Sequence, residues 1–297
     1  GHPEYGETDG VETTTGPLGQ GFGNAVGMAL TEKILAAKYN TEKHNIVDHY
    51  TYTIMGDGCM MEGITSEAAS LAGHLGLDKL IAIYDDNDIS IAGNTDLAFT
   101  ESVADRFKAF GWQVIENIDG HNIEQLREAI NQAKSDKDRP TVIMAKTHIA
   151  LGAPTKQDTS DAHGAPLGEE EIKGLKKEFG LPEDKKFYVS DEVKEFFRSH
   201  AAEMQDQRLE WEKEFKAWAE ANPQLKKEWD QAMELKLPVD LREEIMDLEI
   251  DAPIATRKSA GAALTKAFEM LPYLVGGSAD LAPSNKTYNA EYGEVQK

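Results

Sequence analysis

The sequence is poor in cysteine and in positive charge, and it contains no long apolar run. Its single cysteine, Cys59, excludes an intramolecular disulfide and any zinc site built from several cysteines. No stretch approaches the roughly 18 consecutive apolar residues of a membrane-spanning helix, and no cationic, apolar secretory signal opens the chain. From these absences we expect a soluble protein of a reducing compartment, the cytoplasm, with no membrane partner.

Acidic side chains outnumber basic ones, with 53 Asp and Glu against 31 Lys and Arg and a net charge of −22. Binding to nucleic acid requires a cationic face that displaces counterions from phosphates, so a nucleic-acid partner is disfavoured. An anionic small ligand would need local positive features instead. These could be a metal ion, helix N-termini, or single Arg and Lys side chains.

The 297 residues have a globular composition, with 40% hydrophobic and 28% charged residues, and could form two domains. Short apolar runs alternate with helical patterns along the first half of the chain. The predicted strands are 52–55, 80–84, 113–115 and 141–144, and the predicted helices are 17–38 (with Pro17 at its first position), 62–73, 101–109 and 122–134. This alternation predicts an α/β fold with a parallel sheet covered by helices on both faces.

We expect three segments along the chain. The α/β domain covers residues 1–185, a helical extension and linker covers 186–252, and a second α/β domain starts in 253–297 with a strand at 273–276. The chain does not begin with methionine, and the second α/β unit stops before it could close a sheet. We therefore expect the sequence to be a fragment.

Gly56-Asp57-Gly58 follows one predicted strand, and Asn87 follows the next. Ligands of parallel sheets bind beyond the carboxyl ends of the strands, where glycines let the backbone approach a phosphate. The Asp57 carboxylate, the Asn87 amide oxygen and a backbone carbonyl near Ile89 would give three hard oxygen ligands. Two diphosphate oxygens and one water would complete an octahedron suited to magnesium or calcium. We expect Asp85, Asp86 and Asp88 to be solvated or to cap the loop.

This spacing is the thiamin diphosphate signature, and further stretches resemble one family. They read Gly-His-Pro-Glu at 1–4, Thr-Thr-Thr-Gly-Pro-Leu-Gly-Gln-Gly at 13–21, Tyr-Asp-Asp-Asn at 84–87, His-Gly-Ala-Pro-Leu at 163–167 and Gly-Gly-Ser-Ala-Asp-Leu-Ala-Pro-Ser at 276–284. Together they closely resemble transketolase, essentially end to end, although they cover only a middle portion of such an enzyme. The resemblance implies a thiamin diphosphate-binding fold that forms a homodimer with active sites at the subunit interface.

The resemblance also implies an activity, that of a transferase of the pentose phosphate pathway. Such an enzyme moves a two-carbon ketol group from a ketose phosphate to an aldose phosphate through thiamin diphosphate. Because further catalytic segments of the family are missing here, we expect the isolated chain to be inactive.

The resemblance assigns cofactor roles residue by residue. The metal ligands would be Asp57, Asn87 and the Ile89 carbonyl, with magnesium or calcium as the metal. The remaining cofactor contacts would be Gly16, Pro17 and Leu18 on the aminopyrimidine side, Gly58 and His163 at the diphosphate, Ile91 and Ile149 against the thiazolium ring, and Asp280 facing the cleft. The family usually has glycine at Ala150, so the path of that loop is expected to differ slightly.

Substrate roles follow from the same resemblance. His2 would hydrogen-bond the terminal hydroxyl of the sugar, and His163 would also face the substrate, so both could assist proton movement. Arg257 and Ser284 would hold the sugar phosphate. Glu62 and Glu67 would link the two active sites across the dimer interface.

Several alternatives stay open. A related thiamin enzyme, such as a dihydroxyacetone synthase or a synthase condensing pyruvate, would keep the cofactor and change the reaction. The stretch 278–284 and Arg257 favour a sugar-phosphate donor. The chain could also be a non-catalytic binding module or a remnant that keeps the fold. On residue type alone, His2 and His163 could be surface histidines, and Glu62 and Glu67 could belong to a solvated helix face.

Overall fold

A computed structural model describes residues 2–234, 237, 240–251 and 253–297. Gly1 of the first motif and five residues of the predicted linker (235–236, 238–239 and 252) lie outside the described residues. The chain divides into two compact units, one of residues 1–208 with Lys297 and one of residues 209–296. The predicted division at 185 and 252 stays a prediction.

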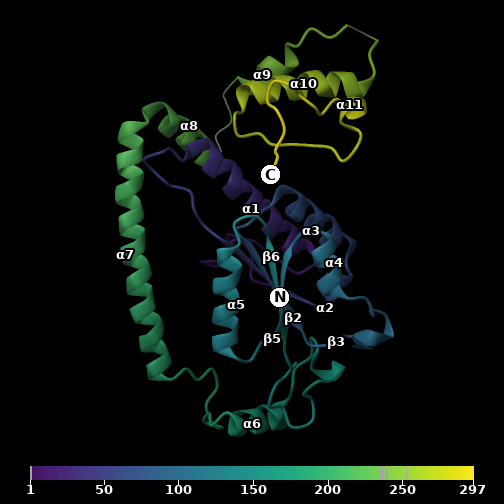
Figure 1. Cartoon of the computed structure of the whole chain (residues 1–297), viewed down its shortest axis with the longest axis vertical. Helices are drawn as coiled ribbons and strands as arrows, with labels where there is room; N and C mark the ends of the chain where they lie inside the picture. Colours follow the sequence, from purple (N-terminus) through teal and green to yellow (C-terminus); the bar gives the residue numbers. More distant parts are fainter. Residues whose placement is uncertain (1, 235–236, 238–239, 252) are drawn as a thin grey trace. The chain divides into compact units, whose positions relative to one another are not determined.

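The first unit is built on a four-stranded sheet (Figure 1). Its strands are β1 (Thr51–Gly56), β2 (Leu80–Asp86), β6 (Thr141–Lys146) and β5 (Gln113–Asp119), in that spatial order, and every neighbouring pair is parallel. The predicted parallel α/β fold is confirmed. A small antiparallel hairpin of β3 (Ile89–Ser90) and β4 (Gly93–Asn94) follows β2.

Helices cover both faces of the sheet, as Figure 1 shows. The helices α1 (Gln20–Tyr39), α3 (Gly63–Leu75) and α4 (Val103–Ala109) share one hydrophobic core with the sheet, and α5 (Ile123–Ser135) contributes to a second core. Along β2, Leu80 and Ala82 belong to the first core, while Ile81 lies in the second. This alternation is the period-two pattern of a strand buried on both faces.

Two helix boundaries near the predicted site were wrong. The helix expected from 17 begins at Gln20, because Gly19 immediately before it has a left-handed backbone with φ 77°. The helix expected at 62–73 is divided into α2 (Asp57–Met61) and α3, because Glu62 between them has an extended backbone. Asp57 is therefore the first residue of a short helix rather than part of a loop.

The remaining helices lie after the sheet. They are α6 (Glu169–Glu178), α7 (Asp191–Ala221), α8 (Pro223–Met233), α9 (Leu241–Met246), α10 (Thr256–Met270) and α11 (Ala282–Asn285), with short 3-10 turns η1 (Thr95–Leu97) and η2 (Ser160–Ala162) earlier in the chain. Within the second unit, the buried Trp218 of α7 packs against Trp229 of α8, with ring centroids 5.9 Å apart. No helix in the described ranges is long and apolar enough to cross a bilayer.

The strand expected at 273–276 does not form. A strand is stabilised by backbone hydrogen bonds to a neighbouring strand. All the strands of the described residues belong to the first unit, so this apolar stretch has no strand beside it within the second unit.

Candidate functional site

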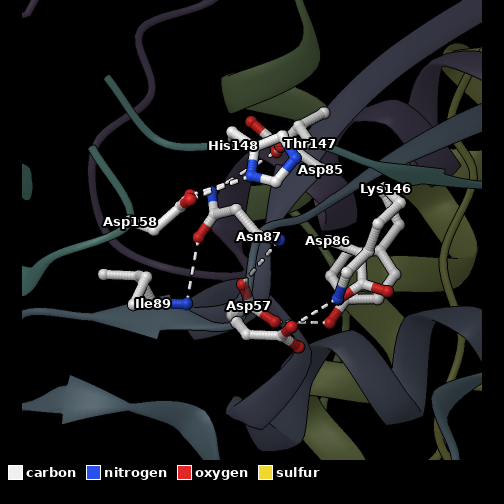
Figure 2. A network of polar contacts seen from close by, with 11 residues as sticks. Asp57, Asp85, Asp86, Asn87, Ile89, Lys146, Thr147, His148 and Asp158 are labelled. Atoms are coloured by element: carbon white, nitrogen blue, oxygen red, sulfur yellow. Dashed lines mark hydrogen bonds and ion pairs between the residues drawn. The ribbon is translucent and has the colours of Figure 1, made fainter. Parts of the chain in front are cut away.

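The residues after β1 and β2 meet at one edge of the sheet. In the register of the two strands Gly56 lies opposite Asp85. Asp57 is the next residue after Gly56 and Asn87 is the second residue after Asp85, so both lie at the same edge of the sheet. Asp57 is buried with 3% of its surface exposed, and the Asn87 backbone N–H donates to its Oδ2 atom at 3.4 Å (Figure 2). The expectation that the two strands are neighbours is confirmed, and it brings these two predicted residues together.

Tyr84 on β2 holds the Asp57 carboxylate. Its hydroxyl donates a hydrogen bond of 2.5 Å to Asp57 Oδ1, and both side chains are buried. Burial raises the pKa of Asp57, the Tyr84 hydrogen bond opposes this effect, and the nearby charge of Asp86 adds to it. Burial and the same hydrogen bond raise the pKa of the Tyr84 hydroxyl. One carboxylate oxygen is thus firmly bound, whereas Oδ2 has a long contact and faces the Asn87 side.

Asn87 forms a tight turn onto the hairpin that follows it. Its Oδ1 atom accepts a hydrogen bond from the Ile89 N–H at 3.0 Å, as Figure 2 shows. An amide oxygen has two lone pairs, so one remains for a cation. No group of three or more His, Cys, Asp and Glu side chains suited to a metal occurs in the part of the chain that the structure describes. The predicted metal ligands are one carboxylate, one amide oxygen and one backbone carbonyl, so they do not form a group of that kind. The metal site therefore stays a prediction.

The acids around Asn87 are paired rather than simply solvated. Lys146 at the end of β6 contacts Asp86 at 3.4 Å and Asp88 at 2.5 Å. The Thr147 hydroxyl donates to Asp85. Burial lowers the pKa of Lys146, but the hydrogen bond to Asp88 and the charges of the two acids outweigh it and raise the pKa overall. Lys146 was missed from the sequence, although it follows a predicted strand at the same sheet edge.

The segment before α1 lies close to this edge and to the N-terminus. A Cβ atom added to Gly16 would come within 2.8 Å of the His2 imidazole, and one added to Gly58 would come within 3.1 Å of Leu18. The pairs His2–Gly16 and Leu18–Gly58 are therefore packed in contact. Three residues predicted for the cofactor, Gly16, Leu18 and Gly58, are thus brought together in two pairs with each other and with His2, which was predicted to bind the substrate.

For the other predicted residues of the first unit, the structure gives chiefly their burial or exposure. The Nδ1 atom of His163 is buried and has no hydrogen-bond partner among the described residues. Ile149 is half-buried after β6, and Ile91 is exposed. Glu62 and Glu67 are exposed beside and on α3.

Three predicted residues belong to the second unit. Arg257 lies in the first turn of α10, Ser284 lies on α11, and Asp280 precedes α11; all three are exposed. Their predicted contacts with cofactor and sugar phosphate stay predictions.

Sequence reasoning missed a histidine pair at the ends of β5 and β6. The rings of His121 and His148 are stacked with centroids 5.8 Å apart, and His148 Nδ1 lies 3.0 Å from both carboxylate oxygens of Asp158. The signal that identified Asp57 and Asn87 was also present here. Each histidine lies two residues beyond a strand of the same parallel sheet, so both belong to the same edge.

Comparison with known proteins identifies the family of this chain. The family described as "Transketolase, thiamine diphosphate binding domain" matches residues 1–238. The chain belongs to the transketolase family. The transketolase of Geobacillus stearothermophilus is 48% identical over 288 residues, and transketolase 1 of Escherichia coli is 48% identical over 294 residues.

Solved transketolases share the fold. The enzyme from Leishmania mexicana superposes with a TM-score of 0.90 at 46% identity over 96% of this chain. The Pichia stipitis transketolase in complex with sedoheptulose-7-phosphate superposes with a TM-score of 0.91 at 42% identity over 97% of this chain. The chain spans about 43% of the length of the curated transketolases that it matches and about 42% of the Leishmania chain.

Proposed function

We propose that this chain carries the diphosphate-binding half of a transketolase active site, which holds thiamin diphosphate through a divalent cation. The observation that carries the proposal is the buried Asp57 carboxylate beside Asn87, at the carboxyl edge of a parallel sheet in a thiamine diphosphate binding family. The whole enzyme would transfer a two-carbon ketol group from a ketose phosphate to an aldose phosphate. It would act as a cytoplasmic homodimer of the pentose phosphate pathway.

The residues present fit such a cofactor. Asp57 Oδ2, the second lone pair of Asn87 Oδ1 and the Ile89 carbonyl are hard oxygen donors of the kind that magnesium and calcium prefer. The cation would offset the charge of the diphosphate in a chain whose net charge is −22. Gly58 lies in α2 directly after Asp57, and Leu18 packs where a Gly58 side chain would lie, so the backbone at this position would be the part that meets the diphosphate.

The other predicted residues would serve the ring and the substrate. Bound thiamin diphosphate would supply a carbanion and an electron sink for the carbon–carbon bond cleavage. Gly16, Pro17 and Leu18 would pack on the aminopyrimidine side, and Ile91 and Ile149 would shield the thiazolium ring from water. His163 would reach the diphosphate and the substrate side of the ring, and its Nδ1 atom has no hydrogen-bond partner among the described residues that would compete with this role.

Substrate selection would depend on further side chains. His2, packed on Gly16, would hold a proton at the terminal hydroxyl of the sugar, and His163 would also assist proton movement on the substrate. Arg257 and Ser284, near the start of two helices of the second unit, would bind the sugar phosphate, with Asp280 facing the cleft. Glu62 and Glu67, exposed on the first unit, would connect the two sites of the dimer.

The proposal is tested by the magnesium dependence of pyrophosphate binding, measured by calorimetry. We expect Asp57→Ala to abolish binding, because it removes the one carboxylate ligand. Asp96→Ala, which removes an exposed acid of η1, is the matched control and should leave binding unchanged. Unchanged affinity of the Asp57→Ala chain in magnesium would refute the metal assignment.

The reaction itself needs a separate test on a transketolase of the family's full length that carries this sequence. A panel of donors should show turnover with ketose phosphates. Preference for pyruvate as the donor would indicate a related synthase. Transfer of the two-carbon group to formaldehyde, which gives dihydroxyacetone, would indicate a dihydroxyacetone synthase-like enzyme.

A further inference from the structure

The loop that leaves β6 is closed on itself by two contacts of one residue. The Asp158 backbone N–H donates to the Ile149 carbonyl oxygen at 3.1 Å. The Asp158 carboxylate lies 3.0 Å from His148 Nδ1, measured to each of its oxygens. Because a carboxylate only accepts hydrogen bonds, the imidazole is the donor. The side chain and backbone of Asp158 therefore hold the two residues with which the loop begins.

His148 is also held by His121, which lies two residues beyond the end of β5. Its backbone N–H donates to His121 Nε2 at 2.9 Å, and the two imidazole rings lie nearly parallel at 10°. The Asp119 carboxylate at the end of β5 accepts a hydrogen bond from the backbone N–H of His121 at 2.9 Å. Asp119, His121, His148 and Asp158 thus form a continuous chain of contacts from the sheet to the end of the loop.

The loop keeps an unfavourable backbone at both of its ends. Ala150 has φ 52° and Asp158 has φ 57°, in the left-handed region that favours glycine. A non-glycine residue stays in such a conformation only where the surrounding contacts determine it. The contacts of His148 and Asp158 are placed to do this, since Asp158 is itself one of the two residues and His148 lies two residues before Ala150.

The loop also starts next to the predicted metal site. The Thr147 N–H donates to the Asp86 carbonyl at 3.1 Å, one residue before Asn87. A ligand held by its diphosphate between β1 and β2 would therefore have the 148–158 loop, which follows β6, as a neighbour on one side.

We propose that the His148–Asp158 pair is a clasp that fixes the 148–158 loop as one wall of the cofactor site. This inference rests on the proposed function. His148 and Asp158 would act as positioning residues, because they orient the segment that carries Ile149 and leave the metal and diphosphate contacts to Asp57 and Asn87.

Two substitutions at one position isolate the clasp. Asp158→Gly keeps the left-handed backbone without strain and removes the carboxylate. Asp158→Asn tolerates the same backbone and keeps an oxygen that accepts from His148. His148→Phe keeps a ring that can stack on His121 and removes the donor. His148→Phe should weaken thiamin diphosphate binding as much as Asp158→Gly does, and the double variant should bind only slightly more weakly than either single variant.

Ligand binding is measured by calorimetry with thiamin diphosphate and with inorganic pyrophosphate, each in magnesium. We expect Asp158→Gly to weaken thiamin diphosphate binding by about tenfold, the scale of one lost charge-assisted hydrogen bond, and to change pyrophosphate binding less than about twofold. Asp158→Asn should restore most of the affinity. An equal loss for both ligands, no loss for either, or equal binding of both by the unaltered chain would overturn the inference.

Hydrogen exchange tests the clasp without any ligand. In Asp158→Gly the amides of Gly152, Ala153 and residue 158 should exchange faster, with no change in β6, and Asp158→Asn should stay near the unaltered chain. Unchanged exchange in Asp158→Gly would overturn the clasp. An unaltered chain that binds neither ligand in magnesium would instead refute the proposed function and the cofactor role of the loop, while the exchange rates would still decide whether the clasp exists.

Discussion

Replacing Tyr84 by Phe removes one hydroxyl from the centre of the candidate site. The Tyr84 hydroxyl donates to Asp57 Oδ1 at 2.5 Å, and both residues have only 3% of their surface exposed. Phenylalanine fills the same ring volume, so no cavity accompanies the change. A hydrogen bond to a charged group contributes about 1.5–3 kcal/mol, so we expect Tyr84→Phe to lower the free energy of unfolding by about 2 kcal/mol.

The loss is measured by thermal or urea unfolding in metal-free buffer. For a unit of 150–250 residues, about 2 kcal/mol corresponds to a fall in Tm of roughly 4–8 °C. Tyr52→Phe on the adjacent strand β1 is the matched control, because Tyr52 is 46% exposed and loss of its hydroxyl should change stability by less than about 0.5 kcal/mol. Equal stability of the two variants would refute the role given to the Tyr84–Asp57 hydrogen bond.

Three further substitutions test the fold around the site. Ala150→Gly should stabilise the chain by about 1 kcal/mol, because it relieves a left-handed backbone, as urea unfolding would show. Gly73→Ala should cost about 3 kcal/mol or more, because the new Cβ would lie 1.8 Å from the Phe110 carbonyl oxygen. Asp48→Asn should destabilise by at most about 1 kcal/mol at pH 7. The hydrogen bond from Lys79 lowers the pKa of Asp48 from 3.8, so this contribution is present above about pH 4 and is lost as the pH falls through the lowered pKa.

Each of these has its own contrary result. Destabilisation by Ala150→Gly would mean that the loop gains nothing from relief of strain. Gly27→Ala is the control for Gly73→Ala, because a Cβ added at Gly27 on α1 meets open space and should raise the free energy of unfolding by roughly 0.5–1 kcal/mol. A Gly73→Ala variant that is also stabilised would contradict the predicted clash. An Asp48→Asn effect that grows on acidification would contradict the direction of the Asp48 pKa shift.

The sheet and the edge at which Asp57 and Asn87 meet could be predicted from the sequence, because both depend on local patterns. Apolar runs that alternate with helical patterns indicate a parallel sheet, and residues after neighbouring parallel strands must meet at one edge. That rule placed Asp57 beside Asn87. Lys146 and His148 follow the predicted strand 141–144 within four residues, so the same rule points to them. His121 lies six residues beyond the predicted strand 113–115, and only the continuation of β5 to Asp119 brings it to this edge.

Other features depend on contacts that no local pattern encodes. The His148–Asp158 pair requires closure of a ten-residue loop with two strained residues, and the Tyr84–Asp57 hydrogen bond requires the side-chain directions of two different strands. The helix expected at 62–73 is divided from α2 by the extended backbone of Glu62, which nothing in the local apolar pattern indicates. The strand expected at 273–276 was wrong because an apolar run forms a strand only where a neighbour can pair with it.

The central claim is that Asp57 and Asn87 form a metal-dependent diphosphate site in this chain. It is tested most directly by calorimetric titration of thiamin diphosphate into the chain, with magnesium and with a chelator. We predict saturable binding in magnesium that disappears in chelator and in Asp57→Ala. Binding of equal strength in chelator, or no binding by the unaltered chain in magnesium, would contradict the claim.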